Sequence, residues 1–176
     1  MSRPSRAEGE ATTLLNTLGC KETPIPVEQI AIARGAQVTY EVFDGEVSGM
    51  LIRDGERAII GVNSSHAPVR QRFTIAHEIG HLIMHEGTPV FVDRLIRINR
   101  RDGTTSKQER DANAFAAELL MPRGFITARV AALTDKSSGI APERLMEQLA
   151  EEFGVSVLAM SYRLANLDIT DPYPVD

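Results

Sequence analysis

The sequence is poor in cysteine and in long apolar runs, and each lack argues against a class of protein. The chain of 176 residues has one cysteine, Cys20, which cannot form an intrachain disulfide and is typical of a reducing compartment. No stretch approaches the roughly 20 apolar residues of a membrane-spanning helix. The first twenty residues contain no apolar run of signal-sequence length. We therefore expect a cytoplasmic protein with no membrane partner.

Clustered positive charge is also scarce. The formal net charge is −5, whereas a protein that neutralises nucleic-acid phosphates needs grouped Lys and Arg side chains. The exception is a basic segment, residues 94–110, which either binds an acidic substrate or is a solvated loop. We expect no direct binding of nucleic acid.

What is present is a periodicity that changes from helical to strand-like and back to helical. Apolar residues predict an α-helix over 5–18 and a short one over 26–33. Alternating residues then predict a three-stranded antiparallel meander with turns at Asp44-Gly45 and Asp54-Gly55. Its strands are predicted at residues 38–42, 47–53 and 57–62.

The rest of the chain is predicted to be mostly helical. A long helix covers 68–85, a short strand follows at 90–92, and Ser106 caps a helix that ends before Pro122. Glu109 completes a capping-box pattern with Ser106. Two or three helices fill 123–166, and the tail is expected to be loose. We predict an α+β fold: a small three-stranded antiparallel sheet on a helical core (1–122), with a C-terminal helical subdomain (123–176) packed on it as one compact unit.

The long helix carries the motif His77-Glu78-Ile79-Gly80-His81. Because residues four apart lie on one face of a helix, His77 and His81 can place two imidazole nitrogens on one zinc ion. Glu78 is offset by about 100° and can take a proton from water at that metal. The alternative is that both histidines are ordinary helix residues. Against it, three of the four histidines of the chain fall within a stretch of nine residues, on a helix that is otherwise rich in apolar residues. The motif therefore predicts a catalytic zinc site, although two histidines and a carboxylate also suit Mn²⁺.

A third ligand is expected on the helix after Ser106, where the candidates are Glu109, Asp111 and Glu118. Only one face of that helix can meet the histidines, and Glu109 shares its face with small or polar residues. This favours Glu109 and places Asp111 and Glu118 on the solvent-exposed side. We expect Asn113, one turn after Glu109, to orient a ligating histidine through a hydrogen bond.

Two blocks of sequence together resemble the ImmA/IrrE family of metallopeptidases. The first is Arg70-Gln71-Arg72-Phe73-Thr74-Ile75-Ala76-His77-Glu78-Ile79-Gly80-His81-Leu82, and the second runs from Glu109-Arg110-Asp111-Ala112-Asn113 to Met121-Pro122. The likeness covers roughly residues 10–165. It implies a zincin-type, gluzincin-like helical core in which His77, His81 and Glu109 hold zinc and Glu78 is the catalytic base.

The resemblance also implies a partner. Members of the family typically act in bacteria, phages or mobile elements, where they cleave a helix-turn-helix repressor and so switch on stress or excision genes; others belong to toxin–antitoxin-like pairs. We therefore expect an endopeptidase with a helix-turn-helix repressor as its substrate. The alternative is a non-catalytic zinc protein that binds and sequesters such a partner.

Two further histidines and one further motif have more than one interpretation. His85 is either a cation at the end of the helix or a contact for substrate or oxyanion, and His66 is either a surface loop residue or such a contact.

Residues 149–164 resemble a helix-turn-helix, with Gly154 in the turn and Ser156 as a cap. A DNA-reading second helix needs basic residues, and only Arg163 is present. We interpret this segment as core packing, with DNA contact as the alternative.

Overall fold

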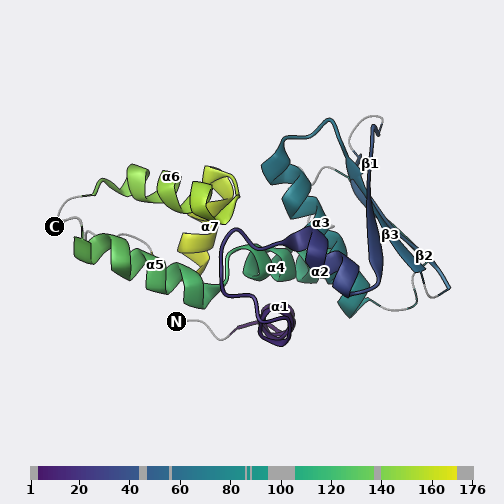
Figure 1. Ribbon diagram of the computed structural model, residues 1–176, viewed down its shortest axis with the longest axis horizontal. Helices are drawn as coiled ribbons and strands as arrows, with labels where there is room; N and C mark the ends of the chain where they lie inside the picture. Colours follow the sequence, from purple (N-terminus) through teal and green to yellow (C-terminus); the bar gives the residue numbers. More distant parts are fainter. Residues whose placement is uncertain are drawn as a thin grey trace.

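The computed structural model describes residues 4–43, 47–55, 57–85, 87, 89–94, 106–136 and 140–169, without the side chains of residues 93, 94, 135 and 136. Helices and strands follow one another in an α+β order (Figure 1). They are α1 (Arg6–Thr17), α2 (Val27–Ala33), β1 (Ala36–Glu41), β2 (Val47–Asp54), β3 (Arg57–Asn63), α3 (Pro68–Met84), β4 (Val90–Arg94), α4 (Lys107–Leu120), α5 (Arg123–Lys136), α6 (Pro142–Phe153) and α7 (Val157–Asn166). None of the described helices is both long and apolar enough to cross a lipid bilayer.

The sheet differs from the predicted three-stranded antiparallel meander. It is a four-stranded mixed sheet in the order β1-β3-β2-β4, in which β1 and β3 run parallel. β2 pairs antiparallel with both β3 and β4, so the predicted turn at Asp54-Gly55 is a hairpin. The predicted turn at Asp44-Gly45 falls outside the described residues, and the strands on either side of it are not paired with each other.

Burial explains why the strand order departs from the chain order. β3 is buried along most of its length, including Ile60 and Val62, whereas most of β1 is exposed or half-buried. A buried strand is stabilised by neighbours on both sides, so β3 takes a central place and β1 the edge. The predicted short strand at residues 90–92 is present as β4 and forms the other edge.

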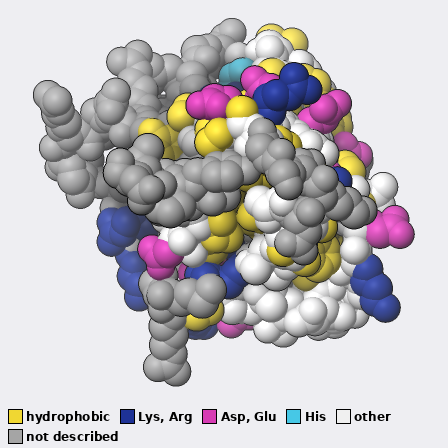
Figure 2. All heavy atoms as spheres, turned by 90° about the vertical axis from the view of Figure 1, so that its left-hand side faces the viewer, with side chains coloured by type: hydrophobic (Ala, Val, Ile, Leu, Met, Phe, Trp, Pro, Cys, Tyr) yellow, Lys and Arg dark blue, Asp and Glu magenta, His cyan; other side chains and the backbone are white. Residues whose placement is uncertain are grey.

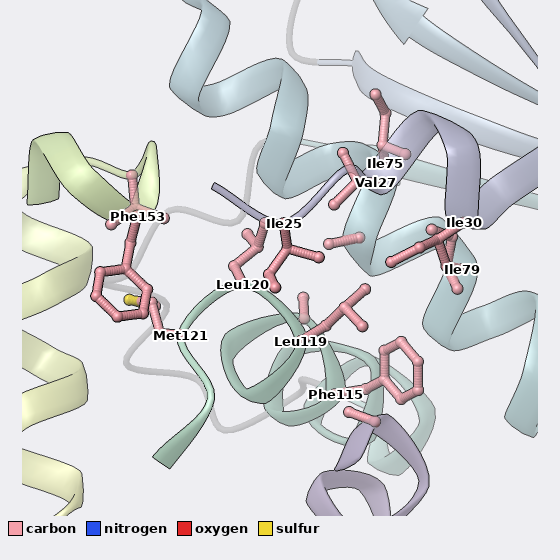
Figure 3. Close-up of a cluster of buried hydrophobic side chains, with 14 of the residues drawn as sticks. Ile25, Val27, Ile30, Ile75, Ile79, Phe115, Leu119, Leu120, Met121 and Phe153 are labelled. Carbon is pink, nitrogen blue, oxygen red and sulfur yellow. The ribbon is translucent and has the colours of Figure 1, made fainter. Parts of the chain in front are cut away.

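Helix α3 packs between the sheet and the helices that follow. It contacts β2 and β3 on one side and α4 on the other, and α4 in turn packs against α1 (Figure 1). Apolar side chains from α2, α3 and α4 meet in a buried cluster around Ile30, Ile79 and Leu119 (Figure 3). Helix α3, which carries the predicted catalytic motif, therefore lies at the centre of the fold.

The C-terminal helices join the same core. Phe153 of α6 and Met160 of α7 are buried in the cluster that also holds Ala11 of α1. Gly154 adopts a left-handed conformation between α6 and α7, and Ser156 caps α7 by accepting from the Ala159 backbone N–H. The predicted boundary between 122 and 123 thus falls at Pro122, just before α5, and it stays a prediction. Residues 95–105 of the basic segment and the tail after residue 169 lie outside the described residues.

Candidate metal centre

Helix α3 brings two imidazole rings together on its buried face. His77 and His81 lie one turn apart and are both almost fully buried. Their Nε2 atoms are 3.1 Å apart, and the two rings meet edge to face. Helix α3 begins at Pro68. Proline suits the first position of a helix, because a backbone N–H there would have no intrahelical acceptor.

Helix α4 supplies a carboxylate to the same point. The two carboxylate oxygens of Glu109 lie 3.3 Å from Nε2 of His77 and 3.2 Å from Nε2 of His81. Ser106 caps the helix, since its hydroxyl accepts from the Glu109 backbone N–H at 3.2 Å. The predicted capping box is therefore half present: the Glu109 side chain faces the histidines. Contact with those two rings, first His77 and then His81, holds the pKa of the Glu109 carboxyl well below its usual range.

The separation of these atoms fits a single metal ion. One atom from each of His77, His81 and Glu109 lies within 4.8 Å of the other two. Tetrahedral coordination with bonds of about 2.1 Å separates neighbouring ligand atoms by about 3.4 Å. The observed separations of 3.1 to 3.3 Å match that edge length. The donor set, two imidazoles and one carboxylate, is one that catalytic zinc sites use.

A hydrogen bond on the far side of the His77 ring sets the tautomer that a metal requires. The Oδ1 atom of Asn113 lies 3.0 Å from Nδ1 of His77. An amide oxygen only accepts, so the neutral His77 ring carries its proton on Nδ1 and presents a lone pair on Nε2. The Nδ1 atoms of His81 and His85 are likewise 3.0 Å apart. Burial lowers the pKa of His81, which favours the neutral ring.

Sequence comparison agrees with this geometry. The sequence model of peptidase family M78, described as an IrrE N-terminal-like domain, matches residues 31–165. The chain belongs to this ImmA/IrrE family of metallopeptidases. It is 32% identical over 116 residues to the radiation response metalloprotease IrrE of Deinococcus radiodurans, which covers 60% of this chain and 34% of the relative. It is 24% identical over 154 residues to the metallopeptidase ImmA of Bacillus subtilis, covering 80% of this chain and 83% of the relative.

Two further comparisons concern longer proteins. The IrrE protein of Deinococcus deserti is 33% identical over 115 residues, covering 64% of this chain and 37% of the relative. A solved structure titled "Mycobacterium tuberculosis transcriptional regulator" superposes with a TM-score of 0.60 at 17% identity, covering 95% of this chain and 48% of that one. At that identity the structural match shows the fold alone. The chain thus spans about a third of the IrrE relatives' length and about half of this structure.

The family's candidate base, Glu78, is fully buried between α3 and the sheet. Its neighbour across the interface is Gly49 of β2, where a Cβ would lie 3.7 Å from Oε1 of Glu78. The same Cβ would lie 2.3 Å from Cγ2 of Thr74 and 2.8 Å from the Gly61 carbonyl oxygen. Only glycine lets the β2 backbone come this close, so the strand lies directly against the carboxylate.

The remaining predicted site residues are placed as follows. His85 is buried at the end of α3, where it contacts His81, and both interpretations of its role stay predictions. His66 is half-buried before α3, where its Nδ1 accepts from Nε of Arg70 at 3.2 Å. Asp111 is half-buried on α4 and is not part of the cluster with the two histidines.

The prediction that Glu118 is exposed to solvent is wrong. Its side chain is only 8% exposed and forms an ion pair with Arg163 of α7. The prediction assumed that only one side of α4, the side that faces the histidines, is buried. In the structure α3 covers one side of α4 and α1 another, so Glu118 points into a second interface. Arg163 is itself 3% exposed, and Leu149, Phe153 and Met160 are buried in the core. Residues 149–164 therefore pack into the core as predicted, and the expected lack of DNA contact stays a prediction.

Sequence reasoning missed two contacts that hold the far end of the site. Phe91 of β4 stacks on the His81 ring with centroids 4.2 Å apart. The Arg53 guanidinium of β2 donates to the His81 carbonyl at 2.7 Å and to the Leu82 carbonyl at 3.3 Å. Cations next to the last carbonyls of a helix stabilise its C-terminus. The Phe91 contact depends on the non-local pairing of β2 with β4, and the Arg53 contact depends on the packing of α3 against β2. No local sequence signal predicts either.

Proposed function

We propose that this chain is a zinc-dependent endopeptidase that cleaves a helix-turn-helix transcriptional repressor. The observation that carries the proposal is the convergence of His77, His81 and Glu109 beside the buried carboxylate of Glu78. Membership of a metallopeptidase family supports the same chemistry. A zinc ion held by these three side chains supplies Lewis acidity, which polarises a peptide carbonyl and acidifies water.

The protein's own residues then have distinct tasks. Glu78 takes the proton from the attacking water and later gives it to the leaving nitrogen of the cut peptide bond. Asn113 keeps the His77 ring in one tautomer, and contact with His85 helps to orient the His81 ring.

The nature of the substrate rests on resemblance. Family likeness favours a repressor, whose removal would induce stress-response or mobile-element genes, or a partner in a toxin–antitoxin-like pair. The second candidate function is sequestration: a complete set of metal ligands does not by itself require turnover, so the protein could hold such a partner without cutting it. The two functions differ in their dependence on Glu78.

The test is incubation of the zinc-loaded protein with the repressor encoded next to it, followed by intact-mass spectrometry. We expect one discrete cut with the wild type and none with Glu78→Gln, which keeps the metal ligands. A parallel incubation with Mn²⁺ compares the two metals. Intact repressor in a stable complex with both proteins would support sequestration, and cleavage by Glu78→Gln would remove the proposed role of that residue.

A further inference from the structure

A groove runs beside the metal ligands, between α7 on one side and α3 and α4 on the other. It consists of two adjoining cavities of about 440 Å³ and about 240 Å³. Both are lined by Phe73, Asn113, Ser156, Leu158 and Ala159, so they form one continuous space. One end reaches Ser48 and Arg70, and the other follows α4 and α7.

The groove adjoins the catalytic centre of the proposed function on the Nδ1 side of His77. Asn113, which lines it, contacts the His77 ring at 3.0 Å. The Phe73 ring lies 6.4 Å from the same ring, centroid to centroid. Thr74 lines the groove too, and it lies with Glu78 against Gly49. A polypeptide lying in the groove is therefore separated from the proposed metal site by the His77 ring and its partner Asn113.

The exposed side chains of the α7 wall of the groove carry no charge. Leu158 and Tyr162 are 55% and 51% exposed, and the one charged residue of α7 is the buried Arg163. On the side of the molecule that carries the C-terminal helices, hydrophobic side chains show near the centre and many of the charged ones toward the edges (Figure 2). An exposed apolar helix face next to a cleft is typical of a protein-binding surface, and a lack of cations makes it unsuited to nucleic acid.

The opposite end of the groove carries a positive charge. Arg70 donates to the Ser48 hydroxyl at 2.8 Å and to the His66 ring at 3.2 Å. Within the part of the chain that the structure describes, no carboxylate contacts Arg70. Arg70 precedes His77 by two helical turns, about 10.5 Å, which corresponds to about three residues of extended chain.

We propose that this groove is the specificity site for the substrate polypeptide. It takes an apolar side chain, such as Leu, Ile or Phe, between Phe73 and Leu158, and an acidic side chain at Arg70, about three residues from the cut bond. This inference rests on the proposed peptidase function. It adds a sequence preference that the metal ligands cannot supply, because they contact only the peptide group being cut.

The test uses a peptide library made by digesting a proteome with trypsin, with cuts identified by mass spectrometry. We expect cuts by the zinc-loaded wild type to be enriched in an apolar residue at one position and in Asp or Glu two to four positions away. Leu158→Asp should lower kcat/KM for the best-cut peptide on the order of 10- to 100-fold. Arg70→Glu should replace the acidic preference by a basic one, and Arg70→Gln should abolish it.

Matched controls place the same charges away from the groove. Ile32, an exposed aliphatic residue of α2, is changed to Asp, and Arg34, which is exposed at the end of α2, is changed to Glu. Neither should change the preference. Unaltered profiles for Leu158→Asp and for both Arg70 variants would overturn the specificity site while leaving the peptidase intact.

A second measurement separates failure of the groove from failure of catalysis. Immobilised, zinc-loaded Glu78→Gln is exposed to the same library, and retained peptides are sequenced. Retention of apolar and acidic peptides that is lost in the Glu78→Gln/Leu158→Asp double variant supports the groove even if the wild type cuts nothing. Cuts by the wild type with no positional preference would overturn the groove alone, and neither cuts nor retention would overturn both proposals.

Discussion

At the scale of single residues, a side chain is a candidate ligand only if its donor atom points toward the place where the His77 and His81 Nε2 atoms meet. Glu109 presents both carboxylate oxygens to the histidines, whereas Asp111, two residues later, is turned away by the helical rotation. The two side chains therefore make a matched pair of acidic residues on one helix. Both carry a carboxylate, but only the Glu109 carboxylate points toward the histidines.

The first prediction uses that pair. Glu109→Ala should weaken zinc binding by more than about 100-fold, because losing a ligand costs more than losing a residue that only supports one. Asp111→Ala should change the affinity by less than about threefold. Competition with a chromophoric chelator measures both without any substrate. Equal affinities for the two variants would remove Glu109 from the ligand set.

The second prediction concerns Asn113, which touches no metal-binding atom of the cluster. Asn113→Leu removes the acceptor for Nδ1 of His77 and leaves the ring free to take the other tautomer, so zinc affinity should fall about 10- to 100-fold. Nitrogen chemical shifts of the histidine rings should show the tautomer change in the metal-free protein. Gln108→Leu, at an exposed position of the same helix, is the control. An unchanged His77 tautomer in Asn113→Leu would contradict the role.

At the scale of elements, the site depends on how closely α3 and α4 approach. Gly80 lies between the two metal-binding histidines of its helix, and a Cβ there would lie 3.2 Å from the Ala112 Cα and 3.2 Å from Cδ1 of Phe115. The backbone of α4 must shift by a few tenths of an ångström to admit a methyl group, and α4 carries Glu109. The glycine thus sets the distance between two ligands on one helix and the third on the other.

The third prediction is that Gly80→Ala weakens zinc binding while the helix propensity of the residue improves. Alanine favours a helix by about 1 kcal/mol over glycine, but overpacking costs about 1–3 kcal/mol, so net stability should fall or stay level. Gly9→Ala in α1, where a Cβ meets no atom within 4 Å, should stabilise the protein and leave zinc affinity unchanged. Urea unfolding and chelator competition on both variants provide the comparison. An unchanged zinc affinity in Gly80→Ala would show that the helix spacing does not tune the site.

The fourth prediction concerns pH and the contact between α2 and β1. The Tyr40 hydroxyl donates to the Glu28 carboxylate. Burial, and then this bond, raises the pKa of Tyr40 to about 12. The folded-state pKa of Tyr40 is higher than its unfolded-state value of about 10. The contribution of the Tyr40–Glu28 contact to stability is therefore fully present below pH about 10, and it is lost as the pH rises through the folded-state pKa of about 12. Tyr40→Phe should therefore be less stable than the wild type at neutral pH, with a difference that shrinks above pH about 10.

Ultraviolet titration of the tyrosines measures the same effect directly. The wild type should show one phenol that ionises near pH 12, and Tyr40→Phe should lack it. Tyr162→Phe on α7 should retain it. Persistence of this ionisation in Tyr40→Phe would assign it to another tyrosine.

The same scale shows what could be predicted from the sequence. Helices and strands follow from local periodicity, so α3 and α4 were predicted within a few residues of their bounds. For the C-terminal part only two or three helices over 123–166 were predicted, without bounds for each, and α5, α6 and α7 lie there. Helical rotation separated Glu109 from Asp111 and Glu118, and the small or polar residues on its face favoured Glu109 as the ligand. The parallel pairing of β1 with β3 was not predicted, since it joins strands separated by β2 and depends on which strand is buried most. Glu118 was misplaced for a related reason: the number of helices that pack around α4 is a tertiary property.

At the scale of the whole molecule, one buried arginine connects the two ends of the chain. Arg163 of α7 bonds Glu8 of α1 at 3.0 Å, forms an ion pair with Glu118 of α4 and donates to the Met121 carbonyl at 3.1 Å. Glu118 also accepts from the Thr12 hydroxyl and from the Arg123 backbone N–H, each at 3.2 Å. This network holds the C-terminal helices, and with them the α7 wall of the groove, against the helix that carries Glu109.

The last prediction is that Arg163→Met destabilises the protein by about 3–5 kcal/mol, because it leaves the Glu118 carboxylate buried without its charge partner. The double variant Arg163→Met/Glu118→Leu should regain a large part of that loss, since it removes the orphaned charge as well. Arg129→Met is the matched control. It breaks the ion pair with Glu152, whose members are 35% and 30% exposed, and should cost at most about 1 kcal/mol. Urea unfolding of all four proteins gives the comparison; a loss no larger than that of Arg129→Met would mean that the network does not join α7 to the core. In that case the groove wall would be free to move independently of the metal ligands.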